Sequence, residues 1–399
     1  MLQEIVEHKR EELQRRSPGK FFRSLKGKHN IIAELKFRSP SGFIADRKLP
    51  EVIKQYDKYA QAISVLTDKK YFGGDLSFIK EVKKYTKLPV LRKDFIIDPL
   101  QVYESAYHGA DAILLIAAIL TEQQLKNFRL LANKLGMDTL VEIHDEDDLQ
   151  KIGDAPIVGI NNRDLKTMKI DINRTIRLKD HITNRIIVSE SGIRSKEDIL
   201  KVDTNAVLIG TALMQGNIED FHRTKLKVCG VHDICQGDML GFNFCDCKRK
   251  IGILKAKELI RQMDLDQQSV GVFMEHTLEE IKEITETTNI DLIQIHDKDL
   301  EFCEEVSKAT NRLIISTTKG TYAHLIDNDE PGTGKAYDRS ILANKEGKIF
   351  AAGGITPTNL TEVLKYKPFA ADIASGVETD GRKDPEKIRA CLDQVLRLT

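Results

Sequence analysis

Short apolar runs rich in β-branched residues recur along this chain, and segments with helical periodicity lie between them. The first half contains eight such runs, spaced by about 20 to 30 residues, the length of one strand plus one helix. Each run is almost continuously apolar, as expected for strands buried on both faces of a parallel sheet. The runs lie at 31–37, 62–68, 89–95, 112–118, 139–145, 157–164, 186–193 and 206–213.

Eight successive strand–helix units predict a closed (β/α)8 barrel, for which about 220 residues suffice. The intervening segment 122–135 illustrates the helical pattern, with apolar residues about 3.6 positions apart. The alternative is an open doubly wound sheet, but such sheets usually contain about five or six parallel strands.

A second series of eight apolar runs begins near residue 227. It occupies residues 225–399, which is short for a barrel. Only ten residues separate Gly230 from Gly241, and only five separate Thr318 from His324, so neither gap has room for a crossover helix. We therefore predict an α/β protein of two tandem TIM barrels, 1–222 and 225–399, the second shortened and lacking crossover helices. The second series lies at 227–231, 240–244, 270–274, 291–296, 312–318, 324–328, 349–355 and 371–377.

Charge and composition restrict the classes of partner. Lys plus Arg and Asp plus Glu number 61 each, so no overall positive field favours nucleic acid or an anionic membrane. The longest apolar run, 112–120, is too short to span a bilayer, and residues 1–16 form an amphipathic charged pattern without a signal-peptide core. The six cysteines lack zinc-site spacing, since Cys245 and Cys247 are too close together. We expect a cytoplasmic protein, monomeric, with reduced thiols.

Polar residues gather where the predicted strands of the first series end, the end at which barrels carry their functional sites. A single lysine in such a place is commonly a solvated turn. A set distributed over five strands would be costly to desolvate unless its charges pair with one another or bind something ionic. The set predicts one functional site and comprises Glu34, Lys36, Lys93, Glu142, Asn161, Arg163, Glu190 and Ser191.

Small residues after the last two strands of each series predict phosphate sites, because backbone N–H groups can approach an anion closely there. In the first series Ser39 and Ser41, after the first strand, add hydroxyl donors. The predicted phosphate residues are Ser191, Gly192, Gly210 and Thr211 in the first series, and Gly353, Gly354, Ser375 and Gly376 in the second.

The motifs IIAELKFRSPSG, LPVLRKDFIIDP, LVEIHDEDDLQ, GINNRDLKT and VSESGI resemble those of indole-3-glycerol phosphate synthase over residues 1–222. The remainder, with KVCG, AAGGI and ASGVETDGRKD, is similar to phosphoribosylanthranilate isomerase, with departures at CKR, PGTG, YDR and QIHD. In some bacteria the two families occur in one chain. The resemblance implies two successive steps of tryptophan biosynthesis, acting on anthranilate-linked sugar phosphates, with no metal or organic cofactor required.

The synthase resemblance implies roles for the strand-end residues. Lys93 would be the general acid of ring closure, with its pKa lowered by burial or by cationic neighbours. Lys36 would hold the anthranilate carboxylate, and Glu142 would move protons during dehydration. Glu34 would pair with a lysine, while Asn161 and Arg163 position the reacting part of the substrate. Glu190 and Ser191 would also contact substrate.

The isomerase resemblance implies a cysteine base, Cys229, an aspartate acid, Asp327, and a carboxylate-binding Arg249. A buried core thiol is the alternative interpretation of Cys229. Three hypotheses follow: a bifunctional enzyme, a synthase with a structural C-terminal remnant, and a sugar-phosphate-binding barrel without catalysis. The paired acids and bases of the first site argue against the last, because a binder needs no acid beside a base.

Overall fold

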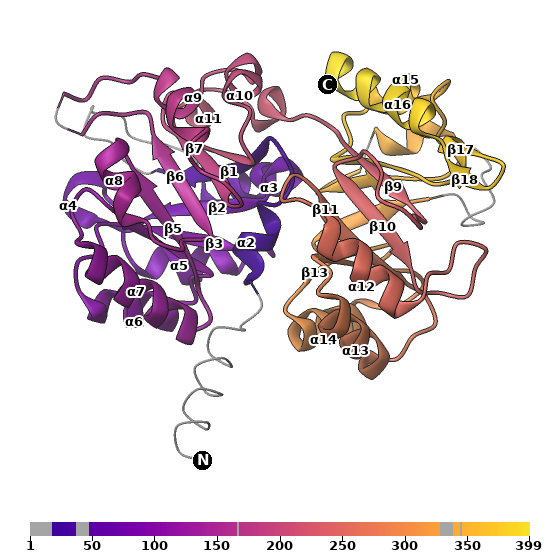
Figure 1. The fold of residues 1–399 in the computed structure, drawn as a ribbon, viewed down its shortest axis with the longest axis horizontal. Helices are drawn as coiled ribbons and strands as arrows, with labels where there is room; N and C mark the ends of the chain where they lie inside the picture. The colour runs from indigo at the N-terminus through magenta and orange to yellow at the C-terminus, as the bar shows by residue number, and fades with distance from the viewer. Residues whose placement is uncertain (1–17, 37–47, 166, 328–337, 344) are drawn as a thin grey trace.

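The computed structural model describes residues 18–36, 48–165, 167–327, 338–343 and 345–399 (Figure 1). The predicted N-terminal helix at 1–16, together with Ser39 and Ser41, lies outside the described residues. Within the part of the chain that is described, no helix is long and apolar enough to cross a bilayer.

The first eight strands form a closed parallel barrel in which each strand pairs with the next and β8 pairs back with β1. This confirms the predicted (β/α)8 sheet and excludes the open alternative. Each predicted run overlaps one observed strand, although β1 and β5 begin one residue earlier than predicted. The strands are β1 (Asn30–Leu35), β2 (Ala62–Leu66), β3 (Val90–Lys93), β4 (Ala112–Ile116), β5 (Asp138–Ile143), β6 (Ile157–Asn161), β7 (Ile186–Glu190) and β8 (Ala206–Ile209).

Helices surround this barrel on its outer face (Figure 1). The predicted helix at 122–135 is α7, whose first turn is capped by the Thr121 side chain. The helices are α2 (Lys20–Ser24), α3 (Leu49–Tyr59), α4 (Lys69–Phe72), α5 (Ser77–Lys83), α6 (Pro99–Tyr107), α7 (Glu122–Lys134), α8 (Glu146–Lys151), α9 (Asn173–Lys179), α10 (Lys196–Val202), α11 (Thr211–Gln215) and the 3-10 turn η1 (Ile218–Phe221).

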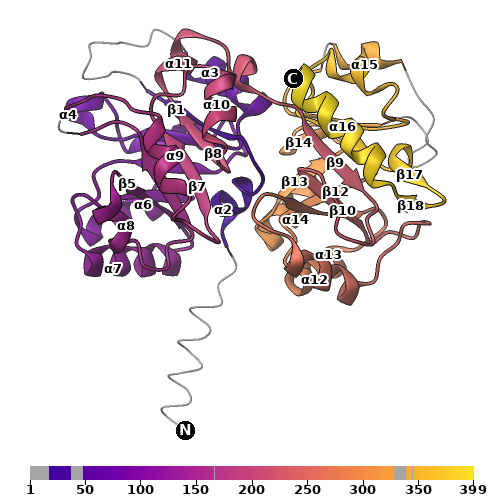
Figure 2. The same cartoon turned by 45° about the horizontal axis from the view of Figure 1, so that its top comes forward.

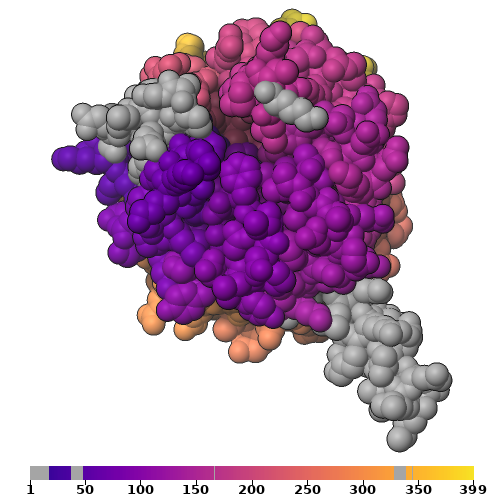
Figure 3. Space-filling view, turned by 90° about the vertical axis from the view of Figure 1, so that its left-hand side faces the viewer, coloured from indigo at the N-terminus to yellow at the C-terminus, as the bar shows by residue number. Residues whose placement is uncertain are grey.

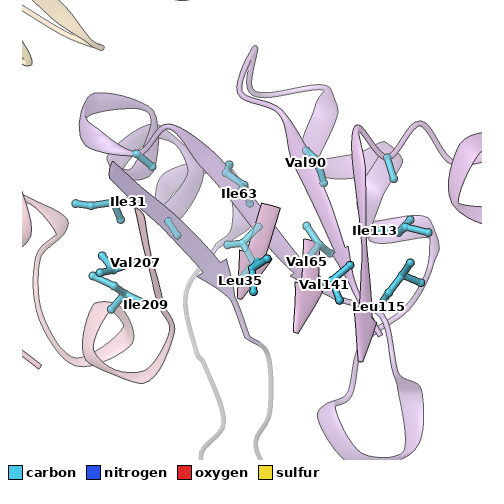
Figure 4. Packing of buried hydrophobic residues seen from close by; sticks show 14 of the residues in the cluster. Ile31, Leu35, Ile63, Val65, Val90, Ile113, Leu115, Val141, Val207 and Ile209 are labelled. Carbon is cyan, nitrogen blue, oxygen red and sulfur yellow. The ribbon is translucent and has the colours of Figure 1, made fainter. Parts of the chain in front are cut away.

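Strand alternation divides the apolar core of the first barrel into two layers. Ile31 and Leu35 belong to the layer between strands and helices, seen with their neighbours in Figure 4. Ile32 points into the barrel and packs in a separate inner cluster. Glu34, two positions further along β1, shares that inward face. The same alternation that buries the core therefore aims this carboxylate into the barrel.

The second series also closes into a barrel, in the order β10 to β16 and then β9. The described residues contain no helix between β9 and β10 or between β13 and β14, as predicted. The strands are β9 (Lys225–Cys229), β10 (Met239–Asn243), β11 (Gln268–Phe273), β12 (Leu292–Ile295), β13 (Leu313–Ser316), β14 (Ala323–Ile326), β15 (Ile349–Ala351), β16 (Ala370–Ile373) and a small hairpin, β17 (Glu378–Thr379) with β18 (Arg382–Lys383). The helices are α12 (Ile253–Gln262), α13 (Leu278–Thr288), α14 (Leu300–Thr310), η2 (Arg339–Leu342), α15 (Leu360–Leu364), η3 (Ser375–Val377) and α16 (Pro385–Leu398).

The two barrels lie side by side and share a buried polar interface (Figure 1). Asp291 of the second barrel accepts from Lys26 Nζ at 2.7 Å and from Arg23 Nη1 at 3.3 Å, and all three side chains are buried. The side of the second barrel that carries β13 and β14 faces the first barrel (Figure 2). Tyr322, in the loop without a helix, packs against the cores of both barrels. The first barrel thus covers apolar surface that a crossover helix would otherwise cover.

Candidate active sites

A cavity of about 860 Å³ opens at the carboxyl ends of the strands in the first barrel. The space-filling view shows a recess on the corresponding barrel (Figure 3). The cavity brings together ten of the predicted site residues: Glu34, Lys36, Lys93, Glu142, Asn161, Arg163, Ser191, Gly192, Gly210 and Thr211. Apolar side chains that the sequence analysis did not single out complete its walls, including Phe72, Phe95, Leu165, Met168 and Ile170.

Lys93 ends β3 inside a group of three carboxylates. Its Nζ lies 2.7 Å from Glu190 Oε2 and 3.6 Å from Glu142 Oε2. Burial by itself lowers the pKa of Lys93, but Glu190, Glu142 and Glu34 outweigh it and raise the pKa above its ordinary value. The expectation of a lowered pKa is therefore wrong. The prediction assumed that burial or cationic neighbours would lower this pKa, whereas the neighbouring strand ends place carboxylates around Lys93.

Glu190 is the buried partner of Lys93. Its pKa is raised to about 7 as the net result of three effects. Burial raises the pKa, the ammonium of Lys93 lowers it and the charge of Glu142 raises it. The carboxylate has room because Gly159 stands beside it on β6: a Cβ at that position would come within 2.1 Å of Glu190 Oε1. Gly159 contributes to the site through the side chain it lacks, which the apolar pattern of β6 does not reveal.

Lys36 and Glu34 face the same cavity, with Lys36 Nζ 3.9 Å from Glu34 Oε1. Gly210, at the end of β8, leaves space for the Glu34 carboxylate, since a Cβ there would come within 2.3 Å of Glu34 Oε1. Asn161 Oδ1 accepts the backbone N–H of Arg163 at 3.0 Å, which orders the chain after β6.

The residues of the predicted phosphate site lie next to one another at the ends of β7 and β8. Ser191 and Gly192 both have positive φ values, 65° and 87°. This left-handed turn is favourable for glycine but strained for serine. Local strain of this kind is often found where a ligand is bound.

Sequence analysis overlooked His144, although it follows Glu142 by two positions in the quoted motif. Its Nε2 lies 3.4 Å from Glu142 Oε1 and its Nδ1 lies 3.5 Å from Asp148 Oδ2. His144 does not line the cavity, so only the folded structure relates it to the site.

In the second barrel Cys229 ends β9 and is buried. Its Sγ donates to Asn243 Oδ1 at 3.4 Å, and Gly241 on β10 leaves the space that the thiol occupies. Burial raises the pKa of the Cys229 thiol, while the ammonium of Lys227 opposes that effect. Lys227 pairs with Asp372 at 2.6 Å, a buried pair between β9 and β16 that sequence analysis did not single out.

Arg249 lies beside this thiol, above Gly230, where a Cβ would come within 2.4 Å of the arginine side chain. Its Nε and Nη2 donate to the two oxygens of Glu378, at 2.7 and 3.0 Å. Lys383 donates to the same carboxylate at 2.7 Å. Although partial burial would raise the pKa of Glu378, these two cations lower it to about 2.

The other predicted residues of the second barrel also follow strand ends. Asp327 follows β14, Gly353 and Gly354 follow β15, and Ser375 and Gly376 follow β16. The loops after β15 and β16 touch, since a Cβ on Gly376 would come within 1.9 Å of the Ile355 carbonyl oxygen. Arg339 belongs to the YDR motif, one of the departures from the isomerase family. It donates to the carbonyls of Ala352 and Gly353 and so holds the first of these loops.

Two further features of the molecule concern metal and ligand binding. Among the described residues no group of three or more His, Cys, Asp or Glu side chains is arranged to hold a metal ion. A hollow of about 200 Å³ lies between the barrels, lined by Lys20, Lys87 and Tyr322 among others, and does not include Cys229.

Comparison with known proteins agrees with both barrels. Residues 2–224 match the family model "Indole-3-glycerol phosphate synthase", and residues 223–394 match "N-(5'phosphoribosyl)anthranilate (PRA) isomerase". The chain is 34% identical to the "Tryptophan biosynthesis protein TrpCF" of Buchnera aphidicola subsp. Diuraphis noxia, over 94% of this chain and 91% of that protein.

Two further matches have the same character. The TrpCF protein of Vibrio cholerae is 32% identical over 95% of this chain and 89% of its own length. The indole-3-glycerol phosphate synthase of Caldanaerobacter subterraneus is 46% identical over 55% of this chain and 97% of its own length. These relatives favour two active domains over a synthase with a remnant. The chain belongs to the family of bifunctional tryptophan-biosynthesis enzymes, with an indole-3-glycerol phosphate synthase domain followed by a phosphoribosylanthranilate isomerase domain.

Proposed function

We propose that the first barrel closes the indole ring of 1-(2-carboxyphenylamino)-1-deoxyribulose 5-phosphate, with Lys93 as general acid. The aromatic carbon that bears the carboxylate attacks the ribulose carbonyl, and Lys93 protonates the oxygen as it becomes an alkoxide. An alkoxide is a strong base, so an ammonium of raised pKa still donates to it. CO2 then leaves, its bonding electrons pass to the neighbouring iminium, and loss of water completes the aromatic ring.

The charged residues around Lys93 have distinct roles in the remaining steps of the reaction. Glu142 moves protons during dehydration, and Glu190 holds the ammonium in position at 2.7 Å. Lys36 holds the anthranilate carboxylate, and Glu34 steadies Lys36. Glu34, Lys36 and Glu142 line one cavity with Lys93, and this is the observation that carries the proposal.

The polar turns and the apolar wall orient the substrate between them. Asn161 and Arg163 hydrogen-bond its reacting part. Ser191, Gly192, Gly210 and Thr211 cradle the phosphate, with Ser39 and Ser41 as further donors. The walls formed by Phe72, Phe95 and their neighbours suit an aromatic ring.

The second barrel carries out the preceding step, the Amadori rearrangement of N-(5-phosphoribosyl)anthranilate. Asp327 protonates the ribose ring oxygen, which opens the ring, and Cys229 removes the proton at C2. Arg249 exchanges its Glu378 partner for the anthranilate carboxylate, while Gly353, Gly354, Ser375 and Gly376 bind phosphate. We assign the two activities to residues 1–222 and 225–399, in a cytoplasmic monomer that needs no cofactor.

Replacing Lys93 with alanine tests the synthase mechanism. We expect ring closure to fall by about 100-fold or more, the usual contribution of a positioned general acid, with little loss of fold. Indole absorbance measures the reaction, and denaturant unfolding of the same variant reports on folding of the first barrel. Normal ring closure by Lys93→Ala would refute the assigned acid.

Replacing Cys229 with serine tests the isomerase mechanism. A hydroxyl is a much weaker base than a thiolate, so we expect the fluorescence decay of phosphoribosylanthranilate to slow by at least about 100-fold. Ring closure should be unchanged, because Cys229 belongs to the other barrel. If isomerisation continued at the normal rate, Cys229 would be a core thiol instead.

A further inference from the structure

His144 is a partly buried histidine that lies between two carboxylates outside the substrate cavity. Its Nε2 is 3.4 Å from Glu142 Oε1 and its Nδ1 is 3.5 Å from Asp148 Oδ2. Both ring nitrogens are inaccessible to solvent, and neither makes a well-aligned hydrogen bond with any described residue. Leaving polar atoms buried in this way costs stability, so the arrangement calls for an explanation.

The charges around His144 are mostly negative. Glu142 faces it from β5, Asp148 from α8 and Glu190 from β7, whereas Lys151 pairs with the far oxygen of Asp148 at 3.1 Å. Asp145, Glu146 and Asp147 add exposed negative charge at the start of α8. Burial alone lowers the pKa of His144, but these carboxylates together raise it above its ordinary value. The ring can therefore take up a proton near neutral pH.

The two oxygens of Glu142 have different neighbours. Oε2 is 3.6 Å from Lys93 Nζ, the proposed acid, and Oε1 is the oxygen nearest His144. Glu142 is itself almost fully buried. With substrate filling the cavity, a proton taken up by Glu142 has no direct path to bulk water. A second proton acceptor beside the opposite oxygen can hold the proton until the cavity opens again.

We propose that His144 is a positioning residue that relays protons for Glu142, an inference that rests on the proposed role of Glu142. Glu142 accepts a proton from the substrate during dehydration, and neutral His144 takes that proton from Glu142 Oε1. The resulting imidazolium is stabilised between Glu142 and Asp148, and it returns the proton to Glu142 once the product has left the cavity. Only a proton moves, so no oxidant or further reactant is needed.

Replacement of His144 with glutamine tests the relay, because the amide keeps polarity near Glu142 but carries no proton. We expect kcat for ring closure to fall about 10-fold or more, with KM unchanged within about 2-fold. The loss of kcat at low pH, where His144 is already protonated, should disappear, and added imidazole should restore part of the rate. His181→Gln, at an exposed histidine of the same barrel, is the matched control.

Denaturant unfolding of His144→Gln reports on folding of the first barrel, and His144→Asn provides a second variant of different length. A normal kcat and pH profile would overturn the relay, as would a loss of rate without a changed profile or rescue by imidazole. Glu142→Gln separates the two proposals. If it impairs ring closure while His144→Gln does not, only the relay fails; if neither does, the role of Glu142 fails as well.

Discussion

Single residues decide the electrostatics of the first site. Lys93 and Glu190 come from different strands, and each shifts the pKa of the other, while the charge of Glu142 on a third strand raises both pKa values. The pKa of Glu190, about 7, lies within the working range of an enzyme. Below that pH Glu190 is neutral and no longer holds the ammonium of Lys93.

This coupling predicts the pH dependence of ring closure. kcat/KM should fall as pH decreases through about 7, the value for Glu190 in the free enzyme. Glu190→Gln cannot ionise, so its kcat/KM should be lower above pH 7 and lose this step. Initial rates between pH 5.5 and 9, chosen to span about 1.5 units on each side, measure it. A step that persists in Glu190→Gln would belong to another group.

At the scale of elements, neighbouring strands shape the site as much as the residues that line it. β6 and β7 pair so that Gly159 lies opposite Val188 and Asn161 opposite Glu190. The absent side chain of Gly159 leaves the space for the Glu190 carboxylate. A glycine on β6 thus determines where the carboxylate of β7 can lie.

Gly159→Ala should therefore impair catalysis more than folding. Its Cβ would displace the Glu190 carboxylate from Lys93, so we expect ring closure to fall about 10-fold, with a stability loss of about 1–3 kcal/mol. Steady-state rates and denaturant unfolding measure the two effects. Gly252→Ala is the control, since a Cβ there meets nothing within 4 Å. An unchanged rate in Gly159→Ala would show that the carboxylate need not sit where it does.

For the whole molecule, the interface compensates for the reduced second barrel. The loop between β13 and β14 has no helix, and Tyr322 from this loop packs against both cores. Lys348 of the second barrel donates to the Ala60 carbonyl of the first at 2.7 Å. Separating the barrels would leave such groups exposed or unpaired, so we expect residues 225–399 to be less stable alone than within the chain.

Asp291→Asn tests the interface within the full chain. It removes the charge that balances buried Arg23 and Lys26, and breaking a buried ion pair costs about 3 kcal/mol or more. Denaturant unfolding measures the loss. Glu346→Gln is the control, because its pair with Lys54 crosses the interface but is exposed and should contribute little. Equal stabilities of the two variants would mean that the buried pair does not hold the barrels together.

The amino-acid sequence was enough to predict the two barrels, the missing crossover helices and most of the polar residues that line the first cavity. Strand periodicity and segment length are local properties, and the alternation that buries Ile32 also directs Glu34 inward. It does not reveal the raised pKa of Lys93, the space beside Gly159, the position of His144 between two carboxylates or the Asp291 interface. These were decided by tertiary structure, because each depends on distances and burial among residues that are far apart in the chain or on different elements.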